Sequence, residues 1–259
     1  RITRKLHSFA PNAQIVHIDI DTAAISKNVQ VDVPIVADAK EAVTKMLEYV
    51  TPCETGKWLD TIEDWKAEHP LKMKKKPIMT PQDVIEAINR IFDEAIIVTD
   101  VGQHQMFTAQ FIEITEKKKL LMSGGLGTMG FGLPAAIGAT FGAPERTVCV
   151  FMGDGGLQMN IQELGTIMEQ KAPVKIICLN NNYLGNVRQW QAMFFNRRYS
   201  FTPMLNPDYM KIASAYDIPS KRVFSREELK VAIDEMLSTD GPFLLEACVV
   251  EEGNVLPMT

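Results

Sequence analysis

Apolar residues recur along this chain in two alternating patterns. Short runs of Val, Ile, Leu and Phe, each long enough for one strand, alternate with longer stretches in which apolar positions follow helical spacing. From residue 80 onward, the strand-forming runs are 95–99, 119–122, 147–152, 174–180, 221–224 and 243–250. Strands that alternate with helices are typical of a parallel sheet covered on both faces. We therefore predict an α/β fold over residues 80–259, with a doubly wound and mostly parallel sheet.

The first 50 residues repeat this alternation on a smaller scale. The elements predicted there are strands at 14–20 and 33–36 and helices at 22–28 and 38–49. We interpret residues 1–50 as the end of a second α/β domain, which precedes the larger one.

A connecting stretch separates these two parts. Residues 51–79 mix Pro, Gly and Lys around one short helical segment that carries Trp58 and Trp65. At Thr80, a capping residue is followed by Pro81 and by Asp83 in the first turn, a pattern that marks the start of a helix. Residues 51–79 are therefore predicted to be a linker.

Composition and charge exclude several classes of function. The formal net charge of -5 is mild, and the basic run at 72–76 lies in the predicted linker, so the sequence carries no nucleic-acid-binding pattern. The longest apolar runs have strand length, which excludes a membrane span. The four cysteines include no CxxC pair, which fits a reducing compartment, and we expect a cytoplasmic protein. Because the chain begins without methionine in a helical pattern, we expect it to be part of a longer protein.

Residues that could bind a ligand or take part in catalysis fall directly after predicted strands, where ligands bind in open α/β sheets. Asp154 and Asn181 each follow one strand, and the stretch between them holds one crossover helix, so the two strands should be neighbours. Carboxylate and carboxamide oxygens suit Mg²⁺, which otherwise binds phosphate oxygens and water. Gly155 and Gly156 let the backbone approach a phosphate and open a helix whose first N–H groups attract an anion. These residues predict a site for a diphosphate with Mg²⁺.

This pair resembles the signature of the thiamine-diphosphate enzymes, which is Gly-Asp-Gly followed, after a spacer of this size, by Asn-Asn. Three further segments, 101–106, 123–136 and 184–190, look like the anabolic, FAD-containing acetolactate synthases in order and spacing. Residues 1–3 and 17–21 resemble the end of the central, FAD-binding domain of that family, and 255–258 resembles its C-terminal end. The resemblance therefore covers essentially the whole chain.

The resemblance implies a role for particular residues. The metal ligands would be Asp154, Asn181 and the carbonyl of Tyr183, and Met129 would bend the cofactor into a V. The residues that it assigns to thiamine diphosphate are Val101, Gly102, Gln103, His104, Gly127, Met129, Gly153, Asp154, Gly155, Gly156, Asn181 and Tyr183. Trp190 and Arg1 would line the substrate channel, and Asp19 would lie near FAD.

The resemblance also implies a transferase reaction. Pyruvate is decarboxylated, and the remaining fragment is joined to a second pyruvate or to 2-oxobutyrate, an early step of isoleucine and valine biosynthesis. Thiamine diphosphate, Mg²⁺ and FAD would be the cofactors, and the partners would be a second catalytic subunit, in a homodimer or tetramer, and a small regulatory subunit. The activating glutamate of the family lies on an N-terminal domain that these 259 residues lack, so we expect them to be inactive alone.

Other interpretations remain open at this point. Gly125, Gly127 and Gly130 match the dinucleotide fingerprint, although the acidic residue that should follow the next strand is absent at the required place. A different thiamine-diphosphate decarboxylase or carboligase, including a catabolic enzyme without FAD, and a binding module without activity are further alternatives. The chain departs from the family pattern at Asn182, where glycine is common, and at Asn186, where methionine is common. Asn186 leaves the choice between pyruvate and 2-oxobutyrate as acceptor open.

Overall fold

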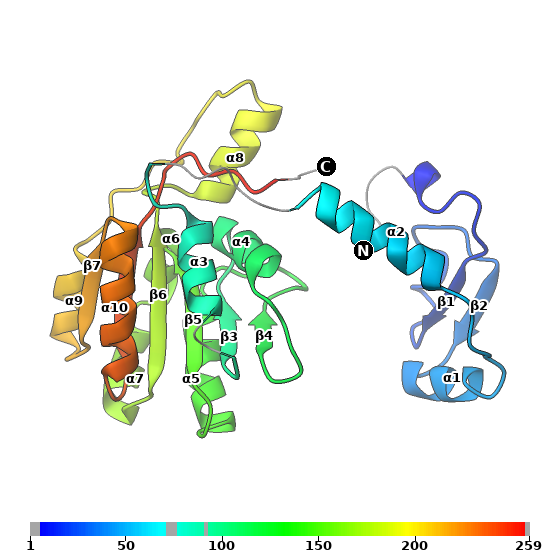
Figure 1. Ribbon diagram of the computed structural model, residues 1–259, viewed down its shortest axis with the longest axis horizontal. Helices are drawn as coiled ribbons and strands as arrows, with labels where there is room; N and C mark the ends of the chain where they lie inside the picture. The colour runs from blue at the N-terminus through cyan, green and yellow to red at the C-terminus, as the bar shows by residue number, and fades with distance from the viewer. Residues whose placement is uncertain (1–5, 71–76, 91–92, 257–259) are drawn as a thin grey trace. The chain divides into compact units, whose positions relative to one another are not determined.

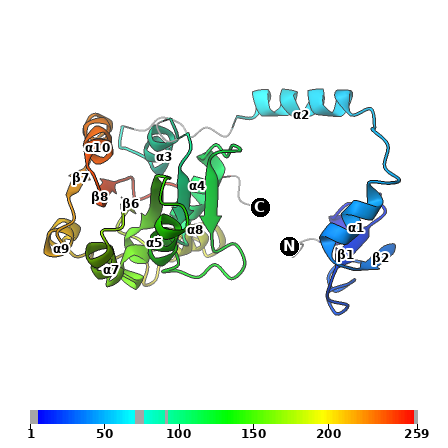
Figure 2. The same cartoon turned by 90° about the horizontal axis from the view of Figure 1, so that it is seen from below.

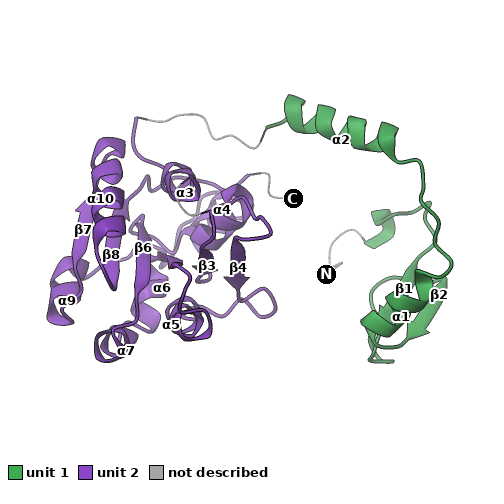
Figure 3. Cartoon of the chain, turned by 60° about the horizontal axis from the view of Figure 1, so that its bottom comes forward, with its two compact units in different colours: residues 1–70 green, residues 71–259 purple. Residues whose placement is uncertain are grey.

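The computed structural model describes residues 6–70, 77–90 and 93–256, and the chain forms two compact units, Arg1–Pro70 and Leu71–Thr259 (Figure 3). In the first unit, a short 3-10 helix (Leu6–Ser8) precedes strands β1 (Val16–Asp19) and β2 (Val33–Val36), which pair in parallel. Helices α1 (Ala39–Met46) and α2 (Gly56–Glu68) follow. Asp38 caps α1, because its Oδ1 accepts from the backbone N–H of Lys40 at 2.8 Å.

The helix predicted at 22–28 is wrong. This segment consists of turns, with backbone bonds from Ala24 to Asp21 and from Lys27 to Ala24. The Oδ1 of Asp21 accepts from the N–H of Ala23, and Ser26 has a φ of 57°, in the left-handed region. A side chain that bonds to its own backbone and a left-handed residue both interrupt a helix within so short a stretch.

The second unit is a six-stranded sheet with helices between its strands. In chain order, its elements are α3 (Pro81–Asn89), β3 (Ile96–Thr99), α4 (Gln103–Phe111), β4 (Lys119–Met122), α5 (Gly132–Gly142), β5 (Val148–Gly153), α6 (Asp154–Met159), α7 (Glu163–Gln170), β6 (Val174–Asn180), α8 (Gly185–Phe194), α9 (Tyr209–Ala215), β7 (Ser220–Val223), α10 (Arg226–Ser238) and β8 (Phe243–Cys248). The strand order is β4-β3-β5-β6-β8-β7, and every neighbouring pair is parallel. The predicted fold class is confirmed.

Helices cover both faces of this sheet (Figure 1). One buried apolar cluster joins the sheet to α3, α4 and α10, and a second joins its other face to α5, α7 and α9. In Figure 2 these two sets of helices lie above and below the strands. All residues of β5 and β6 are buried, because these strands lie in the middle of the sheet between both layers. No helix among the described residues has the length and apolar character needed to cross a membrane.

The start of α3 follows the sequence pattern closely. The backbone N–H of Thr80 donates to Oδ2 of Asp83 at 2.8 Å, and the N–H of Asp83 donates to Oγ1 of Thr80 at 3.3 Å. This capping box satisfies two N–H groups that the helix itself leaves without partners. Val84, Ile85 and Ile88 then point into the core, as their helical spacing predicts.

Candidate functional site

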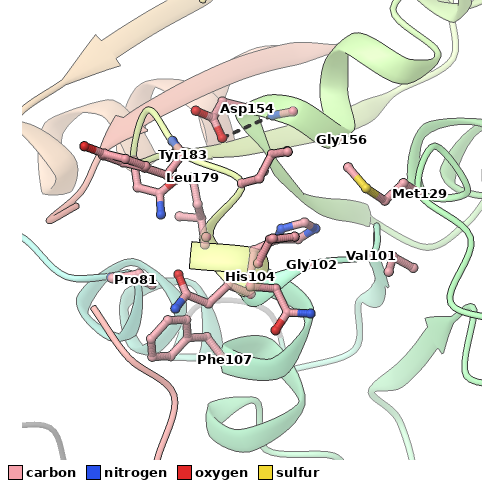
Figure 4. A pocket seen from close by; sticks show the side chains of 18 of the residues that line it. Pro81, Val101, Gly102, His104, Phe107, Met129, Asp154, Gly156, Leu179 and Tyr183 are labelled. Carbon is pink, nitrogen blue, oxygen red and sulfur yellow. Dashed lines mark hydrogen bonds between the residues drawn. The ribbon is translucent and has the colours of Figure 1, made fainter. Parts of the chain in front are cut away.

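A pocket opens at the carboxyl ends of β3, β5 and β6. Strands β5 and β6 are direct neighbours, so the segments that follow them meet at the same edge of the sheet. All twelve residues that the sequence assigns to the cofactor line this pocket. Figure 4 shows Met129 and Tyr183 on opposite sides of the pocket in this view, with Asp154 and His104 between them.

Asp154 begins α6 directly after β5 and is 1% exposed. Its Oδ2 accepts from Nδ2 of Asn206 at 2.8 Å, and its Oδ1 accepts from the N–H of Gly155 at 3.1 Å. Burial raises the pKa of Asp154, whereas these hydrogen bonds lower it in part. No cation among the described residues forms an ion pair with this carboxylate. A buried carboxylate of this kind attracts a cation from solution.

The loop after β6 places Asn181 and Tyr183 in the pocket wall. The N–H of Tyr183 donates to Oδ1 of Asn181 at 3.2 Å, which holds the loop in a tight turn. Asn182 has a φ of 57°, in the left-handed region that glycine and asparagine adopt most readily. Asparagine tolerates this backbone conformation better than most other residues with a side chain.

His104 lies in the first turn of α4 and is 7% exposed. Burial lowers the pKa of this histidine to about 4, although a hydrogen bond to the backbone of Asp100 opposes the shift. The imidazole is therefore neutral at physiological pH, and its Nε2 has no partner within the described parts of the chain. Gly153 makes room for the ring, since a Cβ at that position would lie 2.8 Å from Nδ1 of His104. His104 is one of the residues that line the pocket.

The side chain of Gln103 is directed into the protein. Its Nε2 donates to Oε1 of Gln189 at 2.8 Å and to the carbonyl of Gly253 at 2.6 Å. A carboxamide has two N–H groups, and these two hydrogen bonds occupy both of them. What Gln103 can offer to an anion in the pocket is its backbone N–H, which lies in the first turn of α4, where no side chain caps the helix.

Sequence reasoning assigned no role to Asp100, which the structure shows to support the pocket. Its fully buried carboxylate accepts from the N–H groups of Gly130 and Gly132, at 2.7 and 3.0 Å. Burial raises the pKa of Asp100, whereas its hydrogen bonds to backbone N–H groups lower it. These bonds attach the segment that carries Met129 to the end of β3. The one signal in the sequence for a role of Asp100 is its position directly after a strand.

Asn206 was also missed, because it lies in a loop without motif or periodicity. In addition to Asp154, its Nδ2 reaches Oδ1 of Asn180 and Oδ1 of Asn182, each at 3.2 Å. Asn180 is directed away from the pocket and donates to Oε1 of the buried Glu246 at 2.7 Å. The two adjacent asparagines of the sequence motif therefore face different surroundings.

Of the three remaining predicted residues, only Trp190 can be compared with the pocket, and it lies outside the lining. Trp190 is on α8, is 48% exposed and does not line the pocket. Asp19 belongs to the first unit, at the end of β1, where its Oδ1 accepts from the N–H of Asp21 at 2.9 Å. Arg1 lies outside the described residues. The channel and flavin roles of these residues stay predictions.

Comparison with protein-family models gives two matches. The model described as thiamine pyrophosphate enzyme, C-terminal TPP binding domain, matches residues 100–247, which is more than half of the chain. The model described as thiamine pyrophosphate enzyme, central domain, matches residues 1–46. These matches favour a thiamine enzyme over the nicotinamide alternative.

The chain is also similar to curated proteins over its whole length. It is 41% identical to an acetolactate synthase large subunit from Cyanidium caldarium, of which it covers 46%. It is 39% identical to the acetolactate synthase isozyme 2 large subunit of Escherichia coli strain K12, of which it covers 47%. Its identity to acetolactate synthase 1, chloroplastic, of Nicotiana tabacum is 42%, with 41% of that protein covered. The chain spans about half the length of the curated relatives that it matches.

Proposed function

The chain belongs to the thiamine pyrophosphate enzyme family, and from this premise we propose that it forms the cofactor-binding part of an acetolactate synthase. The observation that carries the proposal is the meeting of Asp154 and Asn181 in one pocket, at the ends of two neighbouring strands. Further support comes from the similarity to acetolactate synthase large subunits along the whole chain.

The residues of the pocket fit a diphosphate with Mg²⁺. Asp154 supplies a buried carboxylate without a charged partner among the described residues, and Asn181 and the carbonyl of Tyr183 supply neutral oxygens, a donor set that Mg²⁺ accepts. Gly155 and Gly156 carry no side chain that would keep a phosphate from the backbone. His104 adds an orphaned, neutral ring nitrogen.

We assign roles to these residues as follows. Asp154, Asn181 and the Tyr183 carbonyl hold the metal ion. The backbone N–H groups of Gln103 and Gly156, together with the ring of His104, bind the diphosphate, and Gly155 lets it approach the backbone. Met129 supports the middle of the cofactor, and the other members of the lining, Val101, Gly102, Gly127 and Gly153, provide backbone contacts and space.

When bound, thiamine diphosphate supplies an electron sink for the decarboxylation of a 2-oxo acid and for transfer of the remaining fragment. The substrates would be pyruvate and, as an alternative acceptor, 2-oxobutyrate. None of the described residues that line the pocket is a glutamate, and Glu163 instead accepts a hydrogen bond from Thr166. As the resemblance to the acetolactate synthases implies, the activating glutamate would come from a second catalytic subunit, and we expect these 259 residues alone to form no acetolactate.

The remaining assignments extend the proposal to the complete protein. Residues 1–50 would be the end of the central, FAD-binding domain, with Asp19 near the flavin and Arg1 and Trp190 at the substrate channel. Residues 51–79, which include α2, would be the linker, and residues 80–259 the thiamine-diphosphate domain. A small regulatory subunit and a cytoplasmic location complete the proposal.

The proposal is tested on the complete protein with pyruvate, Mg²⁺, thiamine diphosphate and FAD. Acetolactate formation and the rise of the unfolding temperature caused by Mg²⁺ with thiamine diphosphate are measured for the wild type and for Asp154→Ala. We expect the variant to lose both. Asp234→Ala, which changes an exposed carboxylate on α10, should retain both. Equal activity of Asp154→Ala and wild type would refute the metal assignment, and decarboxylation of pyruvate without acetolactate would favour another enzyme of the family.

A further inference from the structure

Asn206 lies where the start of α6, the end of β6 and the loop after β6 meet. Its Nδ2 lies within hydrogen-bond distance of Oδ2 of Asp154, at 2.8 Å, and of the side-chain oxygens of Asn180 and Asn182, at 3.2 Å. The nearest of these acceptors is the carboxylate, and a hydrogen bond to an ionised group is stronger than one to an amide. One carboxamide therefore joins the end of β5 to the loop after β6.

The opposite end of Asn206 accepts a hydrogen bond from Gln158. Its Oδ1 lies 3.0 Å from Nε2 of Gln158 and 3.2 Å from the hydroxyl of Tyr209. The Tyr209 hydroxyl also lies 2.8 Å from the carbonyl of Asp154, to which it donates its single proton. The acceptors around Nδ2 and the Nε2 donor of Gln158 beside Oδ1 determine how this amide is oriented, because a reversed amide would set its oxygen against the carboxylate of Asp154.

The surroundings of Asn206 are themselves anchored in the sheet. Asn180 donates to Oε1 of Glu246, whose Oε2 accepts from Nε of Arg222 at 2.6 Å. Glu246 is 2% exposed, so this ion pair is held among the packed strands β7 and β8. Asn206 thus connects a rigid part of the sheet to a single oxygen of Asp154.

We propose that Asn206 is a positioning residue for the metal-binding carboxylate, which holds Oδ2 of Asp154 so that Oδ1 is presented to the cation. This inference rests on the proposed Mg²⁺ site. Oδ1 accepts from the N–H of Gly155 at 3.1 Å, and a carboxylate oxygen has a further lone pair for a metal. Without Asn206 the carboxylate can rotate, and metal binding must then order it. This cost makes the free energy of metal binding less favourable.

The test measures Mg²⁺ binding to the complete protein by isothermal titration in the presence of saturating thiamine diphosphate, together with activity as a function of Mg²⁺ concentration. For Asn206→Ala we expect the Kd of Mg²⁺ to rise by about 10- to 100-fold, as is typical for residues that orient a metal ligand. The rate at saturating Mg²⁺ should stay close to that of the wild type, because the ligand itself is intact. Asn206→Ser, whose shorter side chain cannot span to Oδ2, should shift the Kd in the same direction.

Asn89→Ala is the matched control. The Oδ1 of Asn89 accepts from Nζ of Lys118 at 2.8 Å and from the N–H of Glu113 at 3.2 Å, so this amide also anchors a loop, but it does not line the pocket. Its substitution should lower stability and leave the Kd of Mg²⁺ unchanged. A Kd of Asn206→Ala and Asn206→Ser equal to that of Asn89→Ala would overturn the inference.

A fourth variant, Asp154→Ala, separates this inference from the proposed function. If Asp154→Ala abolishes Mg²⁺ binding while the Asn206 variants bind normally, the metal site stands and only the role of Asn206 is wrong. If Asp154→Ala itself binds Mg²⁺ as the wild type does, the proposed site is wrong and the role of Asn206 is wrong with it.

Discussion

Gln103 and Gln189 are joined by a hydrogen bond of 2.8 Å between Nε2 of the first and Oε1 of the second, although 86 residues separate them. Gln189 also pairs with the backbone of Val255, donating to its carbonyl at 2.8 Å and accepting from its N–H at 3.0 Å. This backbone pair determines the orientation of the Gln189 amide, and hence that of Gln103. The pocket wall, α8 and the segment after β8 are therefore linked through two buried carboxamides.

The substitution Gln189→Ala should reduce the free energy of unfolding by about 2 kcal/mol, because buried partners on Gln103 and Val255 are left unsatisfied. Urea unfolding of the variant checks this value. The control is Gln191→Ala, which removes a similar pair of bonds to the backbone of Ser200, at 3.0 and 3.1 Å, on the exposed side of α8. Its effect should stay below about 1 kcal/mol, since water replaces the lost bonds. Equal losses in the two variants would contradict this explanation.

Two glycine substitutions should have effects of opposite sign. A Cβ on Gly156 would overlap Oδ2 of Asp100, whose carboxylate is held by two backbone N–H groups, so Gly156→Ala should cost roughly 1 to 3 kcal/mol of stability. Gly138 lies on the exposed side of α5 with no atom near a Cβ, so Gly138→Ala should stabilise the protein by about 0.5 to 1 kcal/mol. Chemical unfolding of both variants tests the steric argument. The argument fails if Gly156→Ala leaves the free energy of unfolding unchanged.

His104 should make stability depend on pH in the acidic range. Burial lowers its pKa to about 4 from an ordinary value of 6.5, so the unfolded chain binds more protons between these two values. The contribution of His104 to the free energy of unfolding is therefore full above pH 6.5. It falls by roughly 3 kcal/mol in total as the pH drops toward 4.

The comparison of wild type with His104→Gln isolates this effect. Burial raises the pKa of Asp100 and of Asp154, so these groups change stability in the opposite direction as the pH falls. Unfolding free energies should be measured for both proteins at several pH values from 7 to 4. The difference between the unfolding free energies of the two proteins should narrow or reverse toward pH 4. Parallel plots of unfolding free energy against pH would show that His104 does not titrate as its burial requires.

The four cysteines should differ widely in reactivity. Cys53 is exposed, whereas burial raises the pKa of Cys149 to about 12 and that of Cys248 to about 11, and raises the pKa of Cys178 as well. Because the thiolate is the reactive form, iodoacetamide at neutral pH should label Cys53 in the folded protein and the other three only after unfolding. Mass spectrometry of the labelled peptides checks this order, and rapid labelling of Cys149 in the native state would contradict it.

Local pattern was enough to predict most of the elements. The capping residues around Thr80 and the apolar runs of β5 and β6 report propensities and burial that act over a few residues, and the structure confirms them. The segment at 22–28 was predicted wrongly, because side chain to backbone bonds at Asp21 compete with a helix at short range.

The sequence by itself determined the alternation of strands and helices, and with it the meeting of Asp154 and Asn181, because one crossover connection places successive parallel strands side by side. Only the tertiary structure decided which side chains support that pair. Asn206 reaches Asp154, Asp100 reaches Gly130, and Gln189 reaches Gln103 across long stretches of chain. The reason is physical: periodicity records which face of an element is buried, whereas the partner of a buried polar group depends on strand order and on the path of each loop.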